Sequence, residues 1–213
     1  MTEGLRERKK RQTKQRISDV ATGLFLERGF NAVTIAEIAE AADVSVNTVY
    51  NYFPAKEDLF LDRGGDIVDR LSRHVRGRRA GESAAAAVLR ELRTDVECVS
   101  PAVGLFPGWA DFMKVITEAH ALRSRLWAIQ QEALDNLTTT LAKETDAADG
   151  DPLPGLIAGQ LSWVHSTLMA WIGDEMSERR APAEVSREAL GLLDEMEELL
   201  SEKVLNYAVR GAE

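Results

Sequence analysis

Short polar side chains in residues 34–52 carry the most specific chemistry of this sequence. Thr34 stands three positions before Glu37, a capping-box pattern that marks the start of a helix. Ser45 is placed to cap a second short helix, which must end before Pro54 because proline disfavours helical geometry in the residue ahead of it. Two capped helices joined by a tight turn predict a helix-turn-helix.

The second helix of such a motif fits the major groove of a DNA duplex, where its first residues meet base edges. Asparagine can pair with adenine through two hydrogen bonds, and a valine methyl group can contact the methyl group of thymine. The residues expected to face bases are Val46, Asn47 and Asn51. Hydroxyl groups and a lysine around them suit phosphate oxygens. The residues expected to bind phosphate are Thr34, Ser45, Thr48, Tyr50, Tyr52 and Lys56.

A purely structural interpretation of these side chains stays open. In it Thr34 and Ser45 only cap helices, Tyr50 packs against the first helix of the head, and Lys56 is solvated.

A helix ahead of the motif is expected to hold it in place. Apolar residues recur at spacings of three and four from Ile17 to Phe25, which gives one apolar stripe. Gly29 supplies the left-handed backbone that ends this helix, and Phe30 can fold back on its last turn. Because helical periodicity continues along the chain without strand-like alternation, the sequence predicts an all-α fold.

Charge is distributed unevenly along the chain. Seven of the 26 Lys and Arg residues lie in residues 1–16, against two of the 35 Asp and Glu residues, so this segment carries +5 and the rest −14. A basic arm is attracted to the phosphates of nucleic acid, whereas the acidic remainder of the chain is repelled by them. A disordered basic tail without a partner is the alternative.

Over residues 13–60 the sequence resembles the tetracycline-repressor (TetR) family. The matching positions are Arg16-Ile17, Ala21, Leu24-Phe25, Gly29-Phe30, Thr34, Ile38-Ala39, Val44-Ser45, Thr48-Val49-Tyr50, Tyr52-Phe53, Lys56-Glu57 and Leu59-Phe60. Asp43 departs from the usual glycine at the turn, but aspartate tolerates left-handed backbone. Val46 departs from the polar or basic residue that many members carry, which leaves base preference open.

The resemblance implies an all-α protein of about nine helices. A basic arm (1–12) would precede a three-helix head with the helix-turn-helix (13–56), followed by a larger ligand-binding and dimerisation domain (57–213). A homodimer would bind a near-palindromic operator in double-stranded DNA. The apolar positions expected at the dimer surface are Leu161, Val164, Leu168, Ile172, Leu193, Met196 and Leu200.

Aromatic residues gather next to glycine and proline after residue 104, which is typical of a deformable apolar pocket. The residues expected to line it are Phe106, Trp109, Phe112, Met113, Ile116, Trp127, Gln130 and Trp163, with Gln131 and His165 as further polar groups. Ordinary core packing is the alternative for the aromatic members.

Enzyme chemistry is not expected. Cys98 has no neighbouring histidine, the three histidines lack paired ligand spacing, and no glycine-rich phosphate loop follows a strand, so no metal or cofactor is expected. Without an apolar run long enough to cross a membrane, a soluble, cytoplasmic protein is expected. The sequence favours a transcriptional repressor released from DNA by an apolar or amphipathic effector of unknown identity; the alternative is a DNA-binding dimer controlled by a protein partner or by abundance.

Overall fold

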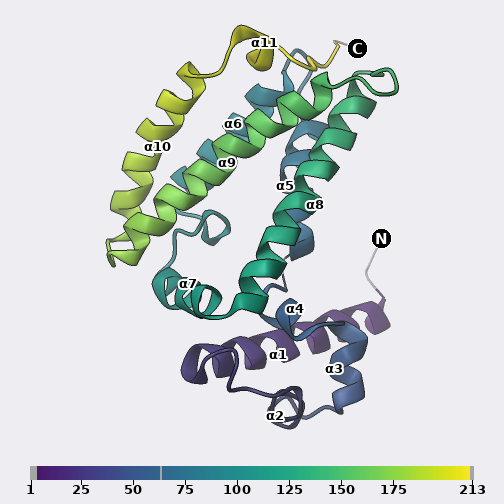
Figure 1. The fold of residues 1–213 in the computed structure, drawn as a ribbon, viewed down its shortest axis with the longest axis vertical. Helices are drawn as coiled ribbons and strands as arrows, with labels where there is room; N and C mark the ends of the chain where they lie inside the picture. Colours follow the sequence, from purple (N-terminus) through teal and green to yellow (C-terminus); the bar gives the residue numbers. More distant parts are fainter. Residues whose placement is uncertain (1–3, 63, 212–213) are drawn as a thin grey trace. The chain divides into compact units, whose positions relative to one another are not determined.

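The structure is a computed structural model that describes residues 4–62 and 64–211 (Figure 1). Every regular element in these ranges is helical, so the expected all-α fold is confirmed. The α-helices are α1 Leu5–Arg28, α2 Ile35–Ala41, α3 Val46–Tyr52, α4 Lys56–Phe60, α5 Gly64–Arg76, α6 Ala84–Glu97, α7 Trp109–Glu118, α8 His120–Glu144, α9 Leu153–Ser177, α10 Pro182–Glu198 and α11 Glu202–Leu205, with a 3-10 turn η1 at Pro101–Val103. Of the helices that the structure describes, none is both long and apolar enough to span a membrane.

The chain divides into two compact units. The first combines Met1–Gly65 with Asp111–Ala128, and the second combines Asp66–Ala110 with Ile129–Glu213. This division differs from the expected boundary after Lys56, because α4 remains with the first three helices and a later segment joins them.

The first unit is built around the apolar stripe of α1. Ile17 and Phe25 are fully buried on this helix, and Phe25 packs edge-on against Phe60 with 5.8 Å between ring centroids. Phe60 in turn stacks on Phe112 at 4.5 Å, and the guanidinium of Arg125 donates to Asp58 at 3.0 Å. These contacts explain why residues 111–128 belong to this unit.

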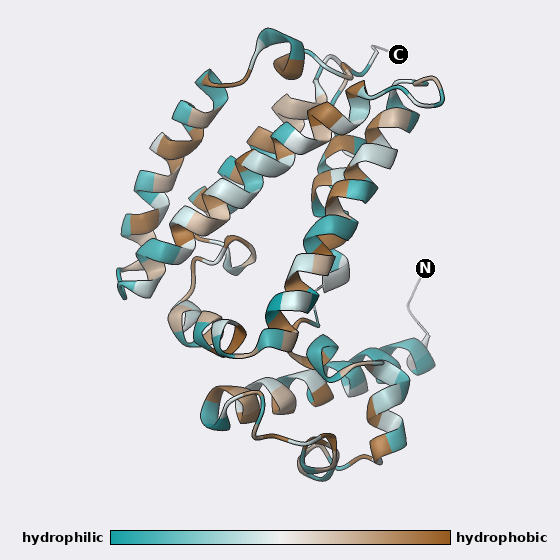
Figure 2. Cartoon of the chain, viewed as in Figure 1, coloured by the Kyte–Doolittle hydropathy of each residue, from teal (hydrophilic) through white to brown (hydrophobic). Residues whose placement is uncertain are grey.

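The basic start of the chain is part of α1 in the described residues. The helix begins at Leu5 and continues to Arg28, so residues 5–12 are not a separate arm. Residues 1–3 of the expected arm lie outside the described residues. Figure 2 shows hydrophilic residues dominating the first part of α1 and hydrophobic residues its later part.

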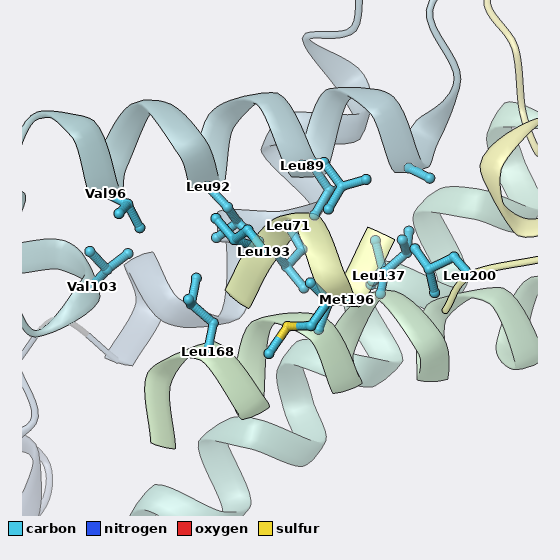
Figure 3. Packing of buried hydrophobic residues seen from close by; sticks show 14 of the residues in the cluster. Leu71, Leu89, Leu92, Val96, Val103, Leu137, Leu168, Leu193, Met196 and Leu200 are labelled. Carbon is cyan, nitrogen blue, oxygen red and sulfur yellow. The ribbon is translucent and has the colours of Figure 1, made fainter. Parts of the chain in front are cut away.

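The second unit buries the apolar faces of α6, α9 and α10 in one core (Figure 3). The seven side chains expected at a dimer surface all belong to this core: Leu161, Val164, Leu168, Ile172, Leu193, Met196 and Leu200. These seven side chains are buried inside a single chain, so the expectation that they form the dimer surface is corrected. The physical reason is that α10 packs on α6 and α9 of its own chain.

Candidate nucleic-acid interface

The α2–turn–α3 segment has the caps that the sequence indicates. The Thr34 hydroxyl accepts from the Glu37 amide at 3.2 Å, and the Glu37 carboxylate accepts from the Thr34 amide at 2.7 Å. The Ser45 hydroxyl accepts from the Thr48 amide at 3.0 Å. Asp43 adopts left-handed backbone, with φ of 51°, so the turn forms without the usual glycine.

The outward face of α3 presents the residues expected to meet bases. Val49 is fully buried and fixes the helix on the first unit, whereas Val46 is 41% exposed. Asn47 and Asn51 are also exposed. The structure therefore brings all three candidate base contacts onto an accessible side of one short helix.

The hydroxyl groups expected to bind phosphate surround this face. Tyr50 is 49% exposed, so about half of its side chain is accessible to a partner. Thr34 and Ser45 are exposed caps, and the Ser45 and Thr48 hydroxyls lie 2.8 Å apart. Tyr52 is half-buried.

Lys56 differs from the expected exposed lysine. Its ammonium donates to the carbonyl oxygen of Phe30 at 2.6 Å and lies 4.3 Å from the centroid of the Phe30 ring and 5.5 Å from that of Phe25. Partial burial lowers the pKa of Lys56. The side chain thus holds the loop after α1, a role that the sequence pattern did not reveal.

An ion pair adds to the capping box of α2. The Arg28 guanidinium donates to the Glu37 carboxylate at 2.7 Å. The hydrogen bonds from Arg28 and Thr34 lower the pKa of Glu37 to about 2. The carboxylate therefore stays charged at the start of the helix-turn-helix over the whole neutral and mildly acidic range.

A cation also lies beside the end of α3. The Lys14 ammonium lies 5.5 Å from the centroid of the Phe53 ring, and Phe53 directly follows α3. The sequence analysis counted Lys14 as a basic residue but assigned it no contact. Its position four residues after Lys10 indicates only that the two lysines share one face of the helix.

The residues expected to line one pocket fall in both compact units. Phe112 stacks on Phe60 within the first unit, whereas Phe106 and Trp109 meet edge to face in the second, with centroids 5.7 Å apart. Trp127 is 64% exposed and Trp163 41% exposed. Gln130, Met113 and Ile116 are exposed, half-buried and buried, respectively.

Two surface hollows, of about 440 and 330 Å³, occur in the second unit instead. The larger is lined by Arg79, Ala80, Gly81, Glu82, Ser83, Ala86, Leu205, Asn206 and Val209, and the smaller by Ala86, Leu89, Arg90, Arg93, Thr94, Glu97 and Glu197. Neither contains any of the eight residues expected to line a pocket.

Two short helices with these caps, this turn and this accessible face define a helix-turn-helix protein. Residues 17–62 match the family model for bacterial regulatory proteins of the tetR family. This part of the chain is therefore similar to the DNA-binding region of that family. The matched residues begin at Ile17, so the basic first part of α1 precedes them.

Individual curated proteins are also similar to part of the chain. The HTH-type transcriptional regulator TcmR of Streptomyces glaucescens is 34% identical over 85 residues, which cover 40% of this chain and 38% of that protein. The HTH-type transcriptional regulator LuxR of Vibrio harveyi is 44% identical over 62 residues, 29% of this chain and 26% of that protein. The chain thus spans well under half the length of these curated relatives.

Similarity of fold extends much further along the chain. A solved structure of a SmeT–triclosan complex superposes with a TM-score of 0.56 at 16% identity, and the match covers 91% of this chain and 94% of that one.

Proposed function

We propose that this protein is a sequence-specific DNA-binding transcriptional regulator that acts as a repressor on a near-palindromic operator. One observation carries the proposal: α3 is fixed by buried Val49 and presents Val46, Asn47 and Asn51 on an accessible face. Such a helix can enter a major groove and read base edges. Repression follows from the resemblance to the tetracycline repressor.

A second copy of the chain supplies the second head in this proposal. The outward face of α9 carries exposed residues at alternating spacings of three and four, which is the repeat of paired helices. These residues are Leu156, Gly159, Trp163, Ser166 and Ala170. Leu156 is 62% exposed and Leu199, just after α10, is 73% exposed. We therefore propose these outward faces, rather than the buried stripes, as the dimer surface.

An apolar or amphipathic effector binding the second unit would release the DNA. The solved SmeT structure contains triclosan, an example of such a ligand on a similar fold. Control without a ligand, by a protein partner or by abundance, is the second candidate. This second candidate is supported by the two hollows of the second unit described above, neither of which contains a residue expected to line a pocket. Thermal unfolding against a metabolite library separates the two, because a ligand of the native state raises the melting temperature.

Selection of bound duplexes from a random pool tests DNA reading. We expect the full chain to enrich a motif with two-fold symmetry. Asn47→Ala and Asn51→Ala should each change the enriched motif, whereas Asn31→Ala should not, because Asn31 is an exposed asparagine outside both helices of the motif. Failure of the chain to enrich any motif would contradict the proposal, and unchanged motifs in both variants would remove these residues from base reading.

A further inference from the structure

The start of α1 forms a charged surface that the helix-turn-helix does not include. We define the basic segment as residues 5–12; it contains five basic residues and one acidic residue, Glu7. The basic residues are Arg6, Arg8, Lys9, Lys10 and Arg11. Every residue from Arg6 to Gln12 is exposed, and from Arg6 onward the first buried residue of α1 is Ile17. The basic segment therefore extends α1 beyond the part that packs in the first unit.

Repulsion between like charges opposes this accumulation of charge on one helix. Arg6 and Lys10 are four positions apart on one helix face, and Lys10 and Lys14 repeat that spacing. Like charges at this spacing destabilise an isolated helix. A helical stretch that is polar on all sides also gains nothing from burial. A polyanion outside the chain would relieve the repulsion.

The position of Lys14 relates the basic segment to α3. The Lys14 ammonium lies beside the Phe53 ring, which directly follows α3, so this face of α1 adjoins the end of the helix proposed to read bases. Arg6 and Lys10 continue the same face because residues four apart stack on a helix. From Arg6 to Lys14 the helix rises about 12 Å. A duplex of that length carries about seven phosphate charges.

We propose that the basic segment binds the phosphate backbone of the duplex beside the stretch that α3 reads. This inference rests on the proposed function and extends it. The contact adds affinity for every sequence and no preference among bases, because phosphates carry no sequence information. The whole chain has a net charge of −9, but its first 16 residues carry +5. Contact through this positive segment lets the acidic chain bind a polyanion.

A charge-matched pair of full-length variants tests the proposal. The first carries Arg6→Gln, Lys9→Gln and Lys10→Gln; the second carries Lys143→Gln, Arg187→Gln and Lys203→Gln, three exposed basic residues of the second unit. Both variants lose three positive charges, so the change in net charge is the same. Each is titrated over a series of KCl concentrations onto the duplex that the wild type selects and onto a scrambled duplex of equal length.

We expect the first variant to bind both duplexes at least about tenfold more weakly at 0.15 M salt. Its slope of log affinity against log salt should be shallower by about 2–5, since each phosphate contact contributes about 0.9 and a dimer has two basic segments. The second variant should match the wild type. The first variant should also enrich the same motif and keep the same melting temperature, because the basic segment has no buried residue from Arg6 to Gln12.

Three results would overturn the inference. Equal salt slopes in the two variants, while the wild type binds DNA, would show that the basic segment makes no phosphate contact and would leave the proposed function standing. A changed motif in the first variant would show that the segment reads bases. A wild-type chain that binds no duplex would contradict the proposed function itself.

Discussion

Lys56 and Phe30 are joined twice, once through the carbonyl oxygen of Phe30 at 2.6 Å from the ammonium and once through the aromatic ring at 4.3 Å. Lys56 begins α4, whereas Phe30 lies in the loop after α1, so the pair closes the first unit across the helix-turn-helix. An ammonium has three hydrogens, and this acceptor uses one of them. Two hydrogens are left for a phosphate oxygen, so we propose that Lys56 also binds phosphate, in addition to its structural role.

The structural role of Lys56 predicts an effect on the protein without DNA. Lys56→Met keeps the aliphatic stem and removes the charged hydrogen bond, so we expect a loss of about 1–2 kcal/mol in the free energy of unfolding. Thermal and urea unfolding of the free protein measure it. Lys143→Met, which changes an exposed lysine, is the control. An unchanged melting temperature in Lys56→Met would leave only the phosphate role.

Tyr50 tests phosphate binding without a change of charge. Its exposed phenol lies on the outward face of α3. We expect Tyr50→Phe to weaken binding to every duplex by about 2–10-fold, the loss of one hydrogen bond of about 0.5–1.5 kcal/mol, with the enriched motif unchanged. Tyr207→Phe, in the second unit, is the control. Equal affinities for Tyr50→Phe and wild type would exclude the phenol from the contact.

Glu37 makes the first unit sensitive to acid. Its pKa is lowered from 4.5 to about 2 by hydrogen bonds from Arg28 and Thr34. A carboxyl group with a lowered pKa in the folded state stabilises the fold above its unfolded pKa and loses that contribution as the pH falls. We therefore expect Glu37→Gln to reduce the dependence of stability on pH between about 4.5 and 2, the window set by the two pKa values.

The matched control for Glu37 is Glu27→Gln, since Glu27 is an exposed carboxylate near the end of the same unit's first helix. Helicity followed across this pH range should separate the two variants. If Glu27→Gln and Glu37→Gln gave the same acid transition, the hydrogen bonds to Glu37 would not govern it.

Local features of the helix-turn-helix were predictable from the sequence, because they depend on neighbouring residues. The Thr34–Glu37 box, the Ser45 cap and the accessible Asn47 all follow from spacing within one or two turns.

Partners distant in the sequence were not predictable. Periodicity indicated an apolar stripe through Leu168 and Leu193, but it could not say whether α6 of the same chain or a second chain would cover that stripe. In the same way, the aromatic composition gave no sign that Phe112 would stack on Phe60, which lies 52 positions earlier in the sequence. Contacts between residues far apart in the sequence depend on the tertiary fold of the whole chain, which local patterns do not reveal.

His165 predicts a second acid response, in the other unit. Its Nε2 atom is out of contact with solvent and has no hydrogen-bond partner among the described residues. Burial, with Arg70 and His74 nearby, lowers the pKa of His165 to about 4. Near pH 6.5 His165 therefore binds a proton in the unfolded chain but not in the folded chain. The free energy of unfolding consequently decreases as the pH falls from 6.5 toward 4. The shift corresponds to about 3 kcal/mol at most.

We expect His165→Leu to flatten the loss of unfolding free energy between pH 6.5 and 4, because leucine fills a similar volume and takes up no proton. His120→Leu, which changes an exposed histidine in the first unit, controls for the loss of an imidazole. Urea unfolding at pH 7, 6, 5 and 4 measures the effect for both variants. Parallel pH profiles for His165→Leu and wild type would show that the imidazole is solvated in solution, and that the interior of the second unit is open at this position.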